Sequence, residues 1–419
     1  MSPWFLLCLA FFASFCLVML NYANWQVKIH GLFVLYVCTA LVSFGLGCFV
    51  CTKVPKAKET QLPLLYEQKT HKRYPAVAFA VISICMLLLY ASKVIADNYA
   101  GLSLSTTLRN IYNNTVENDY SPGIIFTQAR EVLVAIAYIN TYRLITKLFS
   151  RKDKIRYSLL LVPIICFFLF VLLSTDRNIF LRYALYFLCL YVFFYRAHYK
   201  KKNVNVRIFK RVVVFGICIV AAFFLLGRLK QYNSNFFRAI GIYGGSGLYN
   251  FNLWLADFHG PHLYGKATFS TFLRTVQALL GKIGIHVDLT MLSRFDAFIT
   301  FRNPNGYVYS SNIYSALKPY VWDFGYFGVI LFPFVTGLIF QWLYGRAKKS
   351  KGGFAWVLYA SLIYGVIFYP ILEQFFGRFS LGIVYELVWL VVIYHVAFGT
   401  QKLRKCAIET ERVQGVNHG

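Results

Sequence analysis

Ionisable residues beside long apolar segments are the first feature of this sequence that could do chemistry. Three carboxylates, those of Asp176, Asp323 and Glu373, stand at turns or helix ends next to such segments. A carboxylate in this position can accept the proton of an attacking hydroxyl group. Arg177 and Arg378 lie within a few residues of two of these acids, and guanidinium groups bind phosphate oxygens in a bidentate manner. The pattern indicates candidate catalytic acids together with ligands for a phosphate group.

Three further ionisable residues, Arg130, Glu131 and Glu386, fall inside apolar segments. Such groups at membrane depth are functional candidates, because burying an unpaired charge there is costly. For each acid–base pair the alternative is a structural ion pair between helices, and the sequence does not separate the two.

The segment 228–320 is basic, with nine Lys and Arg residues against three Asp. This excess next to apolar stretches favours an anionic amphiphile as ligand, such as a lipid-linked phosphate or pyrophosphate, over attraction to anionic lipid headgroups. Its aromatic residues could stack on sugar rings or form an interfacial belt. The candidate phosphate ligands in this segment are Arg228, Arg238, Arg274, Arg294 and Arg302.

The elements that position these residues are apolar helices. Of the 419 residues, 58% are apolar and only 14% are charged, which is well below the roughly 25% charge of a soluble domain. A bilayer core needs about 20 apolar residues per helix. The predicted membrane spans are 3–21, 29–51, 75–96, 123–145, 158–174, 179–195, 212–227, 321–344, 354–372 and 381–399. We therefore predict an all-α polytopic integral membrane protein with about ten transmembrane helices.

The distribution of Lys and Arg predicts the orientation of these helices. The segments 52–74, 143–156, 196–211 and 345–353, together with the tail after 400, carry most of the 43 basic residues. All of them fall on one side of a ten-helix arrangement, and the positive-inside rule makes that side cytoplasmic. Both termini are then cytoplasmic, and the net charge of +27 needs no nucleic-acid partner.

This topology divides the chain into four parts. Residues 1–227 form the first seven spans, 228–320 a long outer loop, 321–399 the last three spans and 400–419 a cytoplasmic tail.

The long outer loop should be partly helical. The apolar residues of 267–284 follow helical spacing and predict an amphipathic helix at the membrane interface. The stretch 246–258 could form a second helix, capped by Ser246. The glycine-rich residues 241–247 lack the strand–turn–helix context of a nucleotide loop, which favours a hinge or a close helix approach.

Metal and cofactor signals are weak. His259 and His262 form an H-x-x-H pair without a third ligand at matching spacing, and Cys48 and Cys51 form an isolated C-x-x-C. We predict neither a metal nor a cofactor.

Two stretches of sequence and the overall layout resemble a known family. The stretches are STDRNIFLRYALYF (174–187) and SNIYSALKPYVWDFGYFGVILFPFVTGLIF (311–340), and the long outer loop precedes the last three helices. Together they resemble the Wzy-type oligosaccharide repeat unit polymerases, which make O-antigen and capsular polysaccharide. By position, Arg177 matches the family's turn arginine, while Asn312, Tyr314 and Asp323 match residues of the second stretch.

The resemblance implies a metal-independent, type-C glycosyltransferase-like protein in the bacterial inner membrane. It would transfer a growing glycan from undecaprenyl pyrophosphate to a lipid-linked repeat unit at the outer face, and a chain-length regulator is a candidate partner. Two alternatives stay open. One is an O-antigen ligase-like outer-face glycosyltransferase, and the other is a transporter or flippase for lipid-linked oligosaccharides. A transporter often shows paired helix repeats, and none is evident in this sequence.

Overall fold

The structure is a computed structural model of the whole chain. It describes residues 2–53, 74–99, 101, 103–117, 122–149, 155–174, 177–199, 204–228, 236–281, 283–285, 297–350, 352–377 and 381–398. The helices are α1 (Pro3–Leu20), α2 (Tyr22–Trp25), α3 (Gly31–Lys53), α4 (Ala76–Asn98), α5 (Leu104–Glu117), α6 (Ile124–Phe149), α7 (Tyr157–Ser174), α8 (Arg177–His198), α9 (Val204–Arg228), α10 (Phe236–Asp257), α11 (Ser270–Gly281), α12 (Leu317–Ser350), α13 (Phe354–Leu362), α14 (Tyr364–Ile367) and α15 (Leu381–Phe398). A small antiparallel hairpin, β1 (Ile299–Arg302) and β2 (Val308–Ser311), pairs Ile299 with Ser311.

Seven helices in the described part of the chain are long and apolar enough to cross a membrane: α1, α3, α4, α6, α7, α8 and α12. The predicted spans 354–372 and 381–399 contain shorter apolar helices, formed by α13 with α14 and by α15. The predicted span 212–227 lies within α9. The protein is thus a mostly helical, multi-pass membrane protein, and the hairpin is a feature that the sequence pattern missed.

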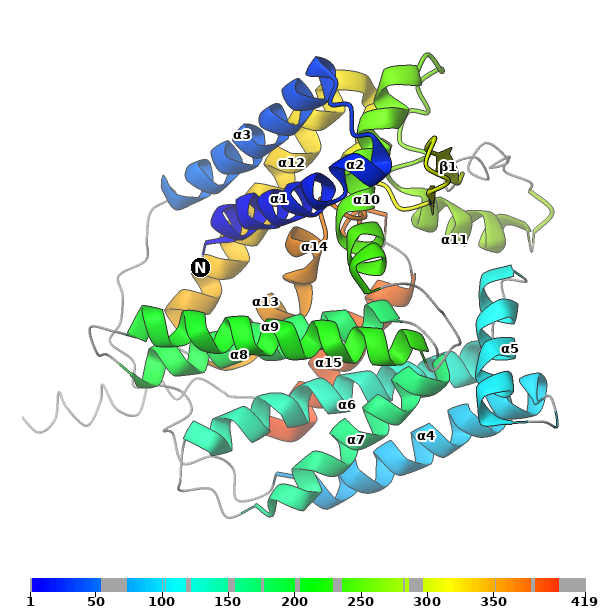
Figure 1. Cartoon of the computed structure of the whole chain (residues 1–419). Coiled ribbons are helices and arrows are strands. Elements are labelled where there is room, and N and C mark those ends of the chain that lie inside the picture. Colours follow the sequence, from blue (N-terminus) through cyan, green and yellow to red (C-terminus); the bar gives the residue numbers. More distant parts are fainter. Residues whose placement is uncertain are drawn as a thin grey trace, which may run out of the picture.

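The long helices form two layers (Figure 1). In one layer α12 packs along α3, and α1 packs on α3 and α10. In the other, α6 contacts α4, α7, α8 and α15, and α9 packs on α8. The short helices α13 and α14 lie between the layers, because α13 touches both α12 and α8 while α14 touches both α1 and α8.

Glycines allow the closest helix contacts within the first layer. A Cβ atom at Gly47 would lie 2.1 Å from the carbonyl oxygen of Phe334, and one at Gly337 would lie 2.3 Å from that of Phe44. Small residues let helix backbones approach in this way in membrane proteins. Because neither position can hold a Cβ atom, these two glycines fix the register of α3 against α12.

The glycine-rich residues 241–247 lie inside α10, where a Cβ at Gly245 would be 3.1 Å from the backbone nitrogen of Val18 in α1. The prediction of a close helix approach is confirmed. The prediction that Ser246 caps a helix is wrong, because α10 starts ten residues earlier. The Ser246 hydroxyl is buried and lies 2.9 Å from the hydroxyl of Ser311.

The helix ends next to the basic segments lie together on one side of the molecule. In Figure 1, α3, α6, α8 and α12 end at the left, where α4, α7 and α9 begin. The hairpin, α5 and α11 lie at the right (Figure 1).

Candidate functional site

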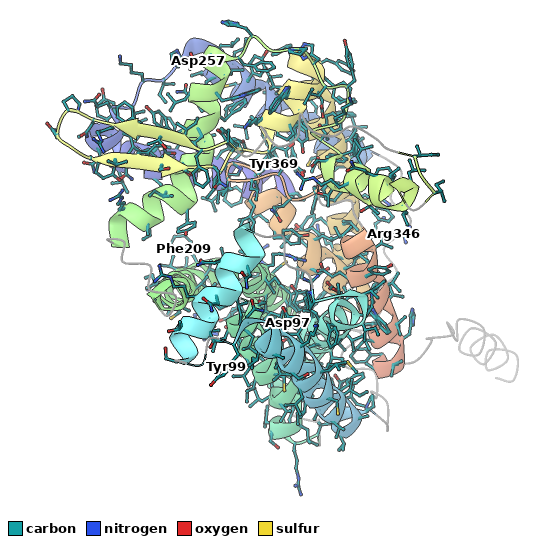
Figure 2. All side chains as sticks on the ribbon, turned by 90° about the vertical axis from the view of Figure 1, so that its right-hand side faces the viewer. Asp97, Tyr99, Phe209, Asp257, Arg346 and Tyr369 are labelled. Atoms are coloured by element: carbon teal, nitrogen blue, oxygen red, sulfur yellow. The ribbon has the colours of Figure 1, made fainter. Side chains whose placement is uncertain are left out.

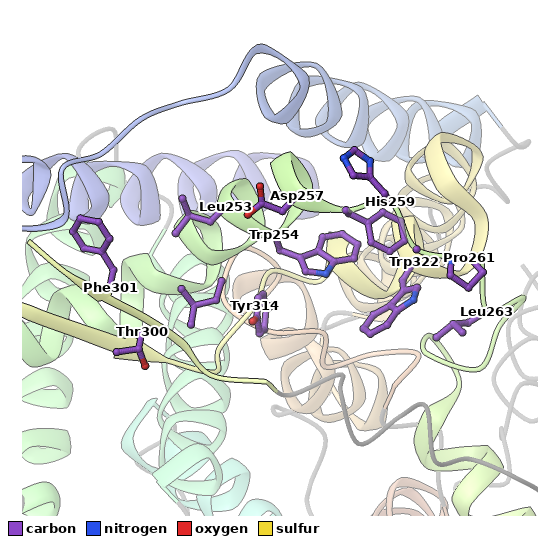
Figure 3. A pocket seen from close by; sticks show the side chains of 13 residues that line it. Leu253, Trp254, Asp257, His259, Pro261, Leu263, Thr300, Phe301, Tyr314 and Trp322 are labelled. Carbon is purple, nitrogen blue, oxygen red and sulfur yellow. The ribbon is translucent and has the colours of Figure 1, made fainter.

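A cavity of about 540 Å³ opens on the side that carries the hairpin (Figure 3). Its wall comes from three stretches that are distant in sequence: residues between 253 and 263, residues 299–301 of the first strand, and Tyr314 with Trp322 near the start of α12. Cavities of this size are typical of small-molecule sites. We take this cavity as the candidate functional site.

Aromatic rings form much of the wall. Trp254 and Phe258, one helical turn apart at the end of α10, stack with ring centroids 4.3 Å apart. The ring of Trp322, from α12, lies 5.8 Å from that of Trp254. Because α10 and α12 each contribute an indole, the cavity depends on how these two helices meet.

Two polar side chains stand at the rim of the cavity. Asp257 is the last residue of α10, His259 follows it by two residues, and both are exposed. Figure 3 shows the Asp257 carboxylate and the His259 ring on the same side of the cavity as the Trp254 ring. The rim therefore offers a carboxylate and an imidazole next to an aromatic surface.

A buried cation stabilises the aromatic wall from behind. The ammonium group of Lys318 lies 3.2 Å from the ring centroid of Tyr314, 5.6 Å from Trp254 and 5.5 Å from Trp322. Only 1% of Lys318 is exposed. Cation–π attraction is strongest where the cation is desolvated, so Lys318 holds these rings in a defined orientation.

The hairpin is anchored to α10 through Asn250. The side-chain amide of Asn250 donates to the carbonyl of Ile313 at 2.8 Å, and its oxygen accepts from the hydroxyl of Tyr309 at 2.6 Å. The hydroxyl of Tyr314 donates to the carbonyl of Ala297 at 2.7 Å. These bonds hold the strand side of the cavity against its helix side. Burial raises the pKa of Tyr309, so this hydroxyl remains a donor.

Asp323, predicted as a proton acceptor, has a structural set of partners. Its carboxylate accepts from the backbone nitrogens of Ala267, at 3.0 Å, and Thr268, at 2.5 Å, and the residue is fully buried. Two residues on, Gly325 has φ 57° and ψ −141°, and this conformation kinks α12. The predicted start of a helix at Asp323 therefore corresponds to this kink, since α12 itself begins at Leu317.

Glu373, the second predicted proton acceptor that the structure describes, lies in the loop between α14 and α15. Its carboxylate accepts from the backbone nitrogens of Phe375 and Phe376, at 2.9 and 2.8 Å, and from that of Gly377. The hydroxyl of Tyr320 donates to it at 3.1 Å. Burial raises the pKa of Glu373, and the backbone hydrogen bonds oppose that rise. The carboxylate organises this loop through four donors.

The predicted phosphate ligands come from several different elements. Arg274 on α11 and Arg302 at the end of β1 are exposed. Arg238 is also exposed, donates to the carbonyl of Val308 at 2.5 Å and lies over the ring of Tyr307. Arg177 begins α8 and Arg228 ends α9. The predicted residues Asp176, Arg294 and Arg378 lie outside the described residues.

Of the two remaining predicted ligands, Tyr314 lines the cavity, whereas Asn312 is exposed beside it after β2. The H-x-x-H pair is divided, because His259 lines the cavity while His262 packs under the kink at Gly325. Within the described ranges, no three His, Cys, Asp or Glu side chains gather as a metal site.

The charges inside the spans form ion pairs. Arg182 of α8 donates to both oxygens of Glu386 of α15, each at 2.5 Å, and lies over the ring of Tyr364. Arg130 pairs with its neighbour Glu131. Arg182, Glu386 and Arg130 each lie five or six residues inside their helix, which is about 8 Å from the helix end. The structural alternative of the sequence analysis fits the Arg182–Glu386 pair, and Arg182 was not among the predicted residues.

Sequence reasoning also missed Asp257, His259 and Lys318 as members of the site. The stretch WLADFHGP (254–261) carries a signal that could have found the first two. The Gly-Pro pair predicts the end of a helix. The acid and the histidine just before it alternate with aromatic residues, and polar groups at such a helix end can border an aromatic cavity. Comparison with protein-family models, curated proteins and solved structures finds no match for this chain. A functional assignment must therefore come from the site.

Proposed function

We propose that this protein is an oligosaccharide repeat unit polymerase of the bacterial inner membrane, with about ten spans and both termini in the cytoplasm. It would transfer a growing glycan from undecaprenyl pyrophosphate to a lipid-linked repeat unit at the outer face. The observation that supports this most directly is the aromatic cavity, with Asp257 at its rim, on the side opposite the helix ends of the basic segments.

The reaction needs three contributions from the chain. A hydroxyl of the acceptor sugar attacks the anomeric carbon of the donor, and the bond from that carbon to the pyrophosphate oxygen breaks. The hydroxyl proton moves to a carboxylate, and the bonding electrons leave with the pyrophosphate. Cations must stabilise the charge on that leaving group, and both sugars must be held in attack geometry.

The described residues are suited to these roles by type and position. Arg238, Arg274 and Arg302 are exposed and can bind the leaving pyrophosphate. The amphipathic helix α11 can place Arg274 at the membrane surface, where the pyrophosphate of a polyprenol lipid would lie. Asp323 and Glu373 are already engaged by backbone donors, so among the described residues Asp257 is the carboxylate that lines the cavity.

Deleting the gene and separating the surface glycan on a gel tests the proposal. We expect single-repeat products in place of a ladder. A full-length polymer that stays on undecaprenyl pyrophosphate would indicate the ligase alternative, and repeat units that never reach the outer face would indicate the transporter. An unchanged ladder would show that this protein is not an enzyme in the synthesis of this glycan.

A charge-reversal pair tests the role of the arginines in cells. The double variant Arg274→Glu/Arg302→Glu should lose the ladder, because carboxylates at these positions repel pyrophosphate. Lys210→Glu is the matched control, since Lys210 is equally exposed but lies near the start of α9, at the opposite side. Both proteins must be present in the membrane fraction at wild-type amounts. Equal ladders in the two strains would remove these arginines from the reaction.

A further inference from the structure

The cavity differs in character from the arginine-bearing surfaces around it. Its wall is aromatic, and its polar groups, Asp257 and His259, stand at the rim. Among the described residues, the wall contains no Lys or Arg side chain, and Lys318 is buried behind the rings and does not line the cavity. The cavity and the exposed arginines therefore suit different parts of a substrate.

We propose that this cavity is a binding site for a pyranose ring of a glycan, an inference that rests on the proposed function for the identity of the whole substrate. One face of a pyranose presents C–H groups, which carry partial positive charge and match the negative face of an aromatic ring. Trp254 and Trp322 supply such faces from two helices. The Asp257 carboxylate can accept hydrogen bonds from the sugar hydroxyls, and the His259 ring can donate or accept them.

The rim argues for a sugar over a lipid chain as the occupant. A polyprenyl chain in the cavity would cover a carboxylate and an imidazole without offering either a hydrogen bond, and an unsatisfied polar group in an apolar contact is costly. The hydroxyls of a sugar satisfy both groups, and its C–H face still contacts the rings.

Preorganisation supports the same conclusion. Lys318 fixes the rings of Tyr314, Trp254 and Trp322 from behind, and Tyr314 is further held by its bond to the carbonyl of Ala297. A rigid stacking surface loses little conformational entropy when it binds a ligand. The aromatic wall therefore has the rigidity of a recognition surface.

The site can be tested on the purified full-length protein. The probes are oligosaccharides released by partial acid hydrolysis of the producing cells' surface polysaccharide, and the readout is quenching of tryptophan fluorescence. We expect saturable quenching by wild type. We expect Asp257→Ala to weaken binding about tenfold or more, the loss expected when hydrogen bonds to a charged group are removed.

Asp97→Ala is the matched control. Asp97 lies in the last turn of α4 in the other layer, pairs with Lys93 on the surface and lies far from Asp257 in Figure 2. This variant should bind as wild type does. Trp254→Phe keeps an aromatic ring in the wall while removing one indole, so it should retain binding with a smaller fluorescence change.

The outcomes separate this inference from the proposed function. Loss of binding in Asp257→Ala together with an unchanged ladder in the deletion strain would keep the sugar site and reject the polymerase. No saturable quenching in wild type, or equal affinity in Asp257→Ala, would overturn the sugar site even if deletion removes the ladder.

Discussion

Replacing Asp323 distinguishes a structural from a chemical role for this carboxylate. The carboxylate accepts two backbone hydrogen bonds from Ala267 and Thr268 inside the protein. A hydrogen bond to a charged group contributes about 1.5–3 kcal/mol. Asp323→Ala removes both acceptors and should lower the free energy of unfolding by about 3–6 kcal/mol. Asp323→Asn keeps one acceptor oxygen and should lose about half as much.

The assay is thermal unfolding of the purified protein in one detergent, followed by tryptophan fluorescence. Asp257→Ala serves as the control, because that carboxylate is exposed and its loss should leave the melting temperature unchanged. We expect the melting temperature to decrease in the order wild type, Asp323→Asn, Asp323→Ala. An Asp323→Ala protein that melts like wild type but makes no ladder would refute the structural reasoning and return Asp323 to a catalytic role.

Three further predictions concern the kink, the buried ion pair and the loop carboxylate. Gly325→Ala should destabilise the protein by about 1–3 kcal/mol in the same melting assay, because its backbone conformation is open mainly to glycine; an unchanged melting temperature would contradict this. Arg182→Ala and Glu386→Ala should each cost about 3–5 kcal/mol, and the double variant should cost clearly less than the sum; strict additivity would argue against the ion pair. Because burial raises the pKa of Glu373 above 4.5, its stabilising contribution is complete below pH 4.5 and is lost as the pH rises through the raised pKa. Wild type should therefore lose stability relative to Glu373→Gln as the pH rises from about 4.5, and a constant difference would contradict the raised pKa.

The helical elements could be predicted because the bilayer imposes a strong local rule. A run of about 20 apolar residues can be recognised in a sequence without any knowledge of tertiary contacts. Such runs form the helices α1, α3, α4, α6, α7, α8 and α12. The amphipathic spacing within 267–284 predicted a helix, and α11 occupies its centre. The hairpin was missed because its two strands are only four residues long and flank a turn.

The candidate site was only partly predictable. Tyr314, which its stretch of sequence predicted as a ligand, lines the cavity, and its role as a ligand stays a prediction. The role of Asp323 could not be read from the chain, because its partners Ala267 and Thr268 are more than fifty residues away. The role of Arg182 could not be predicted for the same reason, because its partner Glu386 lies in α15, which is distant in sequence.

The sequence by itself determined that this chain is a multi-pass helical membrane protein, because hydropathy acts on each segment separately. Only the tertiary structure decided which polar groups are free to meet a ligand. Asp323 and Glu373 are occupied by backbone donors, whereas Asp257 opens onto a cavity that Trp254 and Trp322 reach from different helices. Whether a side chain is engaged or available depends on contacts between distant segments, and those contacts exist only in the folded chain.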